Sequence, residues 1–215
     1  MKNTKKRTKL IRPLLTIVAT AAISTVLIGC GGNATDIPGL TKAFNKVTSY
    51  TVEMKGKNAP EGMKQTIKLK DGKLLKMKMQ SARGCSIMDF ENNLNYMVMG
   101  TKAMKLPMSA EQVKDSGAMT PSEFMNEKSK VLKTEKMGDT DCLVIESTMD
   151  GETGNIWVGT TDGLVRKSVV GKDQMEFIYT NINNVNNSEF ELPKDVKVQD
   201  MTQMMGNMQK MMGGN

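Results

Sequence analysis

The spacing of apolar residues changes after position 47. Up to that point they recur every three or four positions, which places them on one side of a helix; they are Leu40, Ala43, Phe44 and Val47. Pro38 suits a first helical turn, so we expect a helix of about three turns to begin near it. Beyond position 47, Tyr50, Val52 and Met54 alternate with polar residues, which is the spacing of a strand.

A β-hairpin is the clearest local prediction. Asp71-Gly72 separates two runs in which apolar residues alternate with lysines, and such a D-G pair is a strong hairpin signal. The apolar positions are Ile67 and Leu69 before the turn, and Leu75, Met77 and Met79 after it. We therefore expect one apolar face and one lysine-rich, solvated face.

The remaining chain consists of short strand-like runs, interrupted once by helical signals. Two capping-box patterns predict short helices at 109–117 and 121–130. Further strands are expected at 86–89, 95–99, 131–136, 142–148, 155–159, 164–170 and 175–180. Because almost every connection is short, the strands should pair antiparallel, and a sheet of about ten strands must curl or split. The predicted class is α+β, with helices over the apolar face of the sheet.

The first thirty residues have the pattern of an export signal. A basic stretch precedes an apolar run at 14–28, which has secretory length and is short for a membrane span. The run ends in Leu27-Ile28-Gly29-Cys30, which resembles a bacterial lipoprotein signal. That resemblance implies a signal peptide at 1–29, lipidation of Cys30, and a lipidated cysteine and tether at 30–37. The alternative is an ordinary signal anchor with an incidental cysteine.

Removal of the signal changes the charge of the protein. The full chain carries 30 basic and 23 acidic residues; six of the basic ones lie within 1–29, which has no acidic residue. The mature chain is nearly neutral, which argues against nucleic-acid binding. The chain also lacks histidine, the commonest general base and metal ligand. With no Ser-His-Asp set and no nucleotide loop, we expect neither an enzyme nor a cofactor.

Two cysteines besides Cys30 remain, Cys85 and Cys142. An exported chain meets an oxidising compartment, in which paired cysteines tend to form disulfides. A Cys85–Cys142 disulfide would stabilise the fold by about 4 kcal/mol in the chain-entropy model. The alternative is a pair of buried free thiols.

Five segments carry a family signature through their order along the chain: Asp141–Glu146, Asn155–Val158, Gly163–Lys167, Phe190–Pro193 and Val196–Val198. They resemble a strand, a second strand with a tryptophan, a turn with its return strand, and an end-of-domain motif. In this order they are similar to the LolA-like lipoprotein-carrier superfamily, which includes outer-membrane lipoprotein-sorting proteins and LppX-type lipoproteins. The resemblance covers about residues 38–200.

The resemblance implies a strongly curved half-barrel at 38–199, closed by short helices over an apolar cavity that holds acyl chains or lipoprotein lipids, and it carries over no catalytic residue. Val165 and Arg166 depart from it, since the family usually has proline after the Gly-Leu pair. The candidate cavity residues are Leu69, Leu75, Met77, Met79, Met88, Met97, Met99, Trp157 and Phe177. Methionine is adaptable and suits variable apolar ligands. The alternative is that these are ordinary core residues.

The C-terminal segment 200–215 is predicted to be a separate helix. Six methionines fall on one helical stripe: Met201, Met204, Met205, Met208, Met211 and Met212. Asp200 is a suitable N-cap, and Gly213-Gly214 suits the end of the helix. Three interpretations stay open: a lid or core element, contact with a membrane or partner, and Cu(I) binding by thioethers, which select that soft ion.

The favoured function is a membrane-anchored envelope lipoprotein that binds a lipid, an acyl chain or a lipoprotein in an apolar cavity. Its anchor would hold it on the cell membrane or outer membrane, facing the periplasm or the cell exterior. The alternative is a non-enzymatic envelope-stress sensor or scaffold with a self-filled cavity. A third hypothesis is Cu(I) or oxidant buffering by methionine. The sequence leaves the oligomeric state open.

Overall fold

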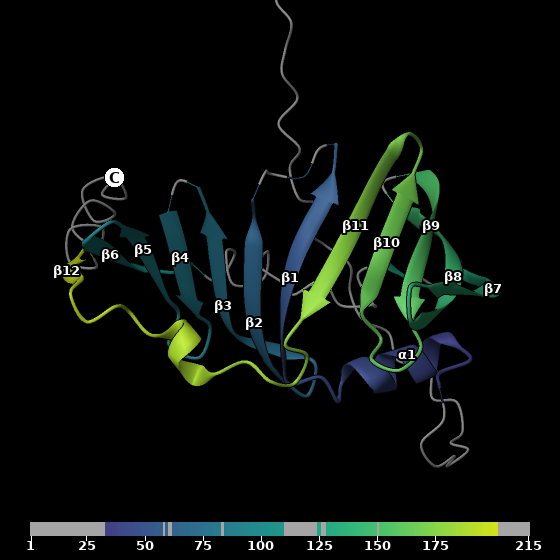
Figure 1. Cartoon of the computed structure of the whole chain (residues 1–215), viewed down its shortest axis with the longest axis horizontal. Helices are drawn as coiled ribbons and strands as arrows, with labels where there is room; N and C mark the ends of the chain where they lie inside the picture. Colours follow the sequence, from purple (N-terminus) through teal and green to yellow (C-terminus); the bar gives the residue numbers. More distant parts are fainter. Residues whose placement is uncertain are drawn as a thin grey trace, which may run out of the picture.

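The computed structural model describes residues 33–57, 59, 62–82, 84–109, 124–125, 128–149 and 151–201, which build a twelve-stranded sheet with helix α1 (Ile37–Phe44) at one end (Figure 1). The strands are β1 (Ser49–Gly56), β2 (Lys64–Lys70), β3 (Lys73–Ser81), β4 (Gly84–Asp89), β5 (Leu94–Met99), β6 (Lys102–Pro107), β7 (Lys130–Met137), β8 (Thr140–Met149), β9 (Glu152–Gly159), β10 (Val165–Val170), β11 (Asp173–Thr180) and β12 (Lys197–Asp200). A short 3-10 helix, η1 (Asn187–Phe190), precedes β12.

The sheet joins two meanders through one long-range pairing. Its strand order is β12-β6-β5-β4-β3-β2-β1-β11-β10-β9-β8-β7. Strand β1 pairs antiparallel with β11, so Val52 lies opposite Tyr179. Strand β12 is the exception to antiparallel pairing, since it runs parallel to β6. Figure 1 shows β12 and β7 at the two ends, so the predicted curved antiparallel sheet is confirmed and remains unclosed.

The sequence predicts about ten strands, and the structure has two more, β6 and β12. Lys105 interrupts the apolar pattern of β6, and the four residues of β12 are all exposed and include one apolar side chain, Val198. Backbone pairing therefore forms β12, with an ion pair between Lys105 Nζ and Asp200 Oδ2 at 2.9 Å. Asp200, the predicted N-cap of the C-terminal helix, is the last residue of this strand. The rest of that helix, 202–215, lies outside the described residues.

The two helices predicted for the middle of the chain fall largely outside the described residues. Within 109–117, only Ser109 is described. Within 121–130, Phe124 and Met125 pack against the hydrophobic core. Lys130 already begins β7, so the second predicted helix ends too late.

Helix α1 begins where the local chemistry predicts. The Asp36 side chain accepts a hydrogen bond from the Gly39 N–H at 2.8 Å, and Pro38 occupies the first turn. Leu40 and Phe44 are buried and belong to the core cluster at the end of the sheet where α1 lies (Figure 1). The predicted amphipathic helix is therefore present and covers one end of the sheet, but it ends at Phe44 and is shorter than expected, so the buried Val47 lies beyond it.

The register divides the sheet into two faces. Residues directly opposite each other share a face, because side chains alternate along each strand. We call the inner face the side that carries Tyr50, Val52, Ile67, Ile156 and Phe177, all of them buried in one hydrophobic cluster. The same cluster contains the buried side chains of α1, so most of the core lies between this face and the helix.

The segment between β11 and β12 crosses the other side, which we call the outer face. Lys78 forms an ion pair with Glu189 at 3.0 Å, and Lys68 donates a hydrogen bond to Asn187. Phe190, at the end of η1, is buried. These contacts guide the chain from the middle of the sheet to its edge, where β12 joins β6 (Figure 1).

A β-bulge corrects one predicted position in the β2–β3 hairpin. Lys68 pairs with Lys76, but Leu69 pairs with Leu74, so Leu75 has no direct partner in β2. Leu74 packs against the core cluster. The sequence pattern predicted that Leu75, and not Leu74, faces the core, because both residues are leucine. The bulge inserts one extra residue into β3 and so shifts which leucine faces the core.

Alanine at Gly163 should destabilise the protein more than alanine at Gly138. Both glycines have positive φ, +67° and +58°. A Cβ at Gly163 would also lie 2.3 Å from the carbonyl oxygen of Leu40, whereas a Cβ at Gly138 would meet nothing within 4 Å. We expect urea unfolding to show a loss of about 1 kcal/mol for Gly138→Ala and at least about 2 kcal/mol for Gly163→Ala. Equal losses would contradict the close packing of α1 on this turn.

Candidate functional site

A continuous row of inner-face side chains crosses the sheet from β11 to β6. Each member lies opposite the next in the register, and the row contains Tyr179, Val52, Gln65, Met79, Ser86, Met97 and Met104. Six strand spacings make it about 29 Å long. The row passes from a packed half of the inner face to a more open half, and the two halves differ in side-chain type.

The packed half lies over β1, β2 and β8 to β11. Its side chains are mostly branched or aromatic and are almost fully buried; they include Tyr50, Ile67, Ile145, Ile156, Val158, Leu164 and Val165. Helix α1 contributes Leu40 and Phe44 to the same cluster. This half forms the rigid core of the molecule.

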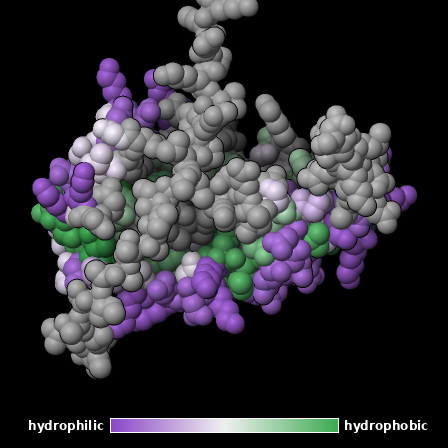
Figure 2. Space-filling model, turned by 180° about the vertical axis from the view of Figure 1, so that it is seen from behind, coloured by the Kyte–Doolittle hydropathy of each residue, from purple (hydrophilic) through white to green (hydrophobic). Residues whose placement is uncertain are grey.

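The open half carries methionines on β3 to β6. We call it the methionine face and define it by Met77, Met79, Met88, Met97, Met99 and Met104. Met77 lies opposite Met88, and Met97 lies opposite Met104. Met77 on β3 is 5% exposed, whereas Met97 and Met99 on β5 are 40% and 54% exposed; Met104 on β6 is partly buried. Figure 2 shows hydrophobic surface in the middle of the side turned away from the viewer in Figure 1, bordered by hydrophilic side chains.

A polar pair lies within the methionine face. The Ser86 hydroxyl lies 2.7 Å from Oδ1 of Asn95, to which it donates a hydrogen bond. Ser86 is opposite Met97, and Asn95 is opposite Met88, so both side chains are on the inner face. This hydrogen bond places a small polar pair among the thioethers of the methionine face.

The structure brings most of the predicted cavity residues onto the inner face. Leu69, Met77 and Phe177 are buried in the core cluster, and Met79 and Met88 pack against it while partly buried. Met97 and Met99 are exposed on the same face. Leu75 is displaced by the bulge described above. The predicted residues are thus divided between a packed core and an accessible apolar surface.

Trp157 lies on the outer face, so the prediction that it lines the inner cavity is wrong. It is opposite Val144 and Lys167, whereas its neighbours Ile156 and Val158 point to the inner face. The Lys167 ammonium lies 5.0 Å from the centre of its ring. Nearby on the outer face, Lys133 and Glu135 form an ion pair at 2.6 Å, and the hydrogen bond from Lys133 lowers the pKa of Glu135.

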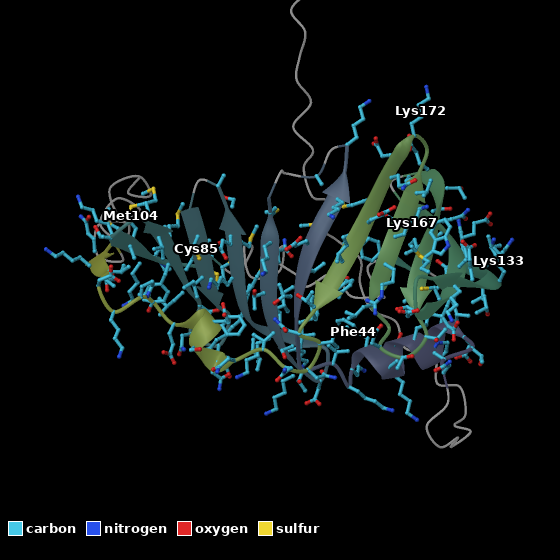
Figure 3. All side chains as sticks on the ribbon, in the orientation of Figure 1. Phe44, Cys85, Met104, Lys133, Lys167 and Lys172 are labelled. Atoms are coloured by element: carbon cyan, nitrogen blue, oxygen red, sulfur yellow. The ribbon has the colours of Figure 1, made fainter. Side chains whose placement is uncertain are left out.

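The predicted disulfide between Cys85 and Cys142 is also wrong. Both cysteines are free thiols. Cys85 lies on β4 and Cys142 on β8, which are seven strand spacings apart, or about 33 Å. A disulfide requires Cα atoms within about 7 Å. Figure 3 shows Cys85 in the half of the sheet away from Lys133 and Lys167, which flank the β8 side.

A polar cluster that the sequence did not predict lies where β10 begins. Arg166 forms an ion pair with Asp162, and the exposed fractions of their side chains are 13% and 15%. The guanidinium carbon lies 4.7 Å from the centre of the Tyr179 ring, which makes an edge contact with Tyr50 at 5.3 Å. Burial raises the pKa of the Tyr179 hydroxyl well above its usual value. In the sequence, this cluster is marked only by Val165 and Arg166, which stand where the family resemblance expects a proline.

Two open hollows among the described residues are polar. One of about 330 Å³ is lined by Lys55, Gly56, Lys57, Lys172, Gln174 and Glu176. The other, of about 430 Å³, is lined by Lys128, Ser129, Lys130, Glu146, Ser147, Thr148 and Thr153. Neither matches the large apolar cavity that the family resemblance implies.

The described residues provide no group of three or more cysteine or carboxylate side chains that could hold a metal ion. Of the methionine stripe predicted for Cu(I), Met201 ends the described part of the chain, and Met204 to Met212 lie outside it. Within the described ranges, no helix has the length and apolar composition needed to cross a membrane.

Comparisons with known proteins give structural likenesses only. No protein-family model matches the chain, and no curated protein matches it. An uncharacterized conserved protein from Thermus thermophilus is 9% identical with a TM-score of 0.42, and the match covers 76% of this chain and 96% of that one.

Two mycobacterial structures also match. LprF from Mycobacterium bovis is 9% identical with a TM-score of 0.49, over 75% of this chain and 95% of that one. The lipoprotein LppX from Mycobacterium tuberculosis is 12% identical with a TM-score of 0.39, over 70% of this chain and 94% of that one. These are likenesses of chain arrangement alone.

Cys142 should resist alkylation in the folded protein. Burial raises the pKa of its thiol from 9.0 to about 11, so about one molecule in a thousand carries the thiolate at pH 8. Its alkylation by iodoacetamide, followed by intact mass in a Cys85→Ser form that starts at Gly31, should accelerate as the pH approaches 11. Since the folded pKa exceeds the unfolded one, this thiol favours the folded state below pH 9 and loses that effect toward pH 11.

The protein with both cysteines provides the control. After unfolding without reductant, it should take up two alkyl groups. A mass two hydrogens lower with no uptake would show a disulfide and contradict the separation of the two strands.

Proposed function

We propose that this protein is a membrane-anchored envelope lipoprotein that binds an acyl chain or lipid on the inner face of its sheet, without catalysing a reaction. The observation that carries the proposal is the methionine face, where Met97 and Met99 are 40% and 54% exposed beside a packed apolar core. Methionine is unbranched and polarizable, so such a surface adapts to chains of varied shape.

The dimensions of the methionine face suit one acyl chain. It covers three strand spacings from β3 to β6, about 14 Å. Half of a bilayer core, the depth that one acyl chain fills, is about 15 Å. Transfer of such a chain from water onto apolar side chains contributes roughly 0.8 kcal/mol per buried methylene. A single chain lying across β3 to β6 would therefore find both the length and the chemistry that it needs.

The lipid anchor would hold the α1 end of the sheet near the membrane. The Ala34 N–H donates to the Thr160 carbonyl at 2.9 Å, which fixes the start of the domain beside the β9–β10 turn. Cys30 is three residues before Asn33, so the tether spans at most about 10 Å. The resemblance of the first thirty residues to a lipoprotein signal supports a location in the cell envelope.

A second candidate is a non-enzymatic sensor or scaffold lipoprotein. It is favoured by the packed half of the inner face, where Ile145, Ile156 and Val158 have no exposed surface. A sheet filled by its own side chains can present a surface to a partner without holding a lipid. The two candidates make opposite predictions for lipid uptake.

Lipid uptake should depend on Met97 and not on an equally exposed residue of the outer face. Met97 and Ile178 are both 40% exposed, but Met97 is on the inner face and Ile178, opposite Glu53, is on the outer face. Met97→Asp would place a carboxylate against the bound chain and weaken binding at least tenfold. Ile178→Asp should leave binding unchanged, and both variants should fold like the parent protein because the replaced side chains are exposed.

The measurement is native mass spectrometry of a form starting at Gly31, purified from a membrane-containing host, with organic extraction of any adduct. A stoichiometric adduct of lipid mass, lost in Met97→Asp and kept in Ile178→Asp, is the expected result. An apo mass that also takes up no added fatty acid or phospholipid would overturn the lipid proposal and favour the scaffold.

Anchoring should depend on Cys30 alone. Cys30→Ala removes the acylated thiol, so the full chain should remain uncleaved and carry no added lipid mass, while Cys85→Ala should be processed normally. Intact mass and metabolic labelling with a fatty acid would measure both. Normal lipid labelling of Cys30→Ala would contradict the anchor.

A further inference from the structure

The C-terminal methionine stripe has a defined starting point on the sheet. Strand β12 runs parallel to β6 at the edge of the sheet, with Gln199 opposite Met104 (Figure 1). The pairing continues beyond β12, because the Met201 N–H donates to the Lys105 carbonyl at 3.0 Å. The chain therefore enters the segment 202–215 at the β12 edge of the methionine face.

Side-chain alternation places the start of this segment on the inner face. Met104 lies opposite Met97 on that face, so Gln199, which lies opposite Met104, shares the same side. Met201 follows Gln199 by two residues, which returns an extended chain to the same face, and Met201 is partly buried. Figure 3 shows Met104 close to this edge of the sheet. Met201, the first methionine of the stripe, thus extends the methionine face across β12.

The rest of the stripe matches the methionine face in length and chemistry. As the predicted helix, residues 202–212 would rise about 16 Å, and the face extends about 14 Å from β3 to β6. One side of that helix would carry only methionines, and the opposite side Thr202, Gln203, Gln209 and Lys210. Methionine side chains are adaptable, so two such surfaces can pack together without a rigid fit.

The attached segment is the partner that the exposed thioethers favour. Met97 and Met99 are 40% and 54% exposed, and an exposed apolar patch marks an interaction site. A segment joined directly to β12 has an effective concentration in the millimolar range, about 100-fold above that of a second copy at about 10 μM. Lys210 is the one basic residue of 202–215, whereas helices that lie on membranes are rich in lysine and arginine.

We propose that residues 202–215 dock on the methionine face of their own chain through the methionine stripe, and that an acyl chain displaces them. The docking needs no lipid, whereas the displacement rests on the proposed lipid-binding function. The C-terminal segment is then a cover that competes with the ligand for the same surface.

A pair of cysteines tests the docking in the form that starts at Gly31 and carries Cys85→Ser. Met97→Cys with Met208→Cys joins the face to the middle of the stripe, and oxidation by glutathione disulfide should give a monomer two hydrogens lighter. Ile178→Cys with Met208→Cys is the matched control, because Ile178 is also 40% exposed but lies on the outer face. Intact mass spectrometry over time should show the first disulfide forming about 100-fold faster than the control disulfide.

Two outcomes would overturn the docking. Equal rates of disulfide formation in the two pairs would show that the segment has no preference for the inner face. A disulfide-linked dimer as the main product of the Met97 pair would show that a second copy covers the face.

Met208→Asp tests the competition with an acyl chain. A carboxylate in the stripe is costly to bury against thioethers, so the segment should leave the face. If it covers the face in about nine molecules of ten, its release raises the apparent affinity for palmitate about tenfold. Gln209→Asp changes the polar side of the predicted helix and should keep the parent affinity. Native mass spectrometry with added palmitate measures both.

The outcomes separate the cover from the function that it would regulate. Parent affinity in Met208→Asp would overturn the competition. Uptake of palmitate by none of these proteins would overturn the lipid-binding function, while a rapid disulfide in the Met97 pair would still support the docking.

Discussion

The antiparallel pairing of β1 with β11 is the constraint on which the rest of the molecule depends. It joins two meanders that are each local in sequence, and it runs in register from Thr51 opposite Thr180 to Gly56 opposite Met175. A slip of one residue would turn Tyr179 and Phe177 to the outer face, because side chains alternate along a strand. The core beneath α1 and the inner-face row would both be lost. Folding and the candidate site therefore share one determinant.

Local chemistry was sufficient to predict the elements near α1 and in the β2–β3 hairpin. Asp36 and Pro38 mark the helix start, and Asp71-Gly72 marks the turn, where both residues have positive φ. Such signals act over a few residues and need no tertiary context. Most of the strands were predictable for the same reason, since polar turn residues separate short apolar runs.

The errors came from positions where local chemistry is ambiguous. Ile156, Trp157 and Val158 are all apolar, so alternation could not assign Trp157 to a face, and the pairing of β9 with β10 decided it. The tandem leucines Leu74 and Leu75 concealed a bulge in the same way. The disulfide prediction used the compartment and the number of cysteines, and neither contains the distance between β4 and β8. Arg166 was missed because its partner Asp162 and its neighbour Tyr179 come together only when β10 and β11 are folded.

The two halves of the inner face differ in a way that follows from side-chain stiffness. Branched residues such as Ile156 and Val158 have few rotamers, so they pack into one rigid arrangement against α1. Met97 and Met104 have three rotatable bonds each and lie opposite one another near the edge of the sheet, where Met97 is 40% exposed. The rigid half is filled by the protein's own side chains, while the adaptable half can fit apolar partners of different shape. Arg166 lies at the rigid end of the inner-face row, held by Asp162 on the turn that also packs under α1 through Gly163. The same turn thus ties the helix to the sheet and sets the direction of the buried guanidinium, so a change there would disturb the packing of both.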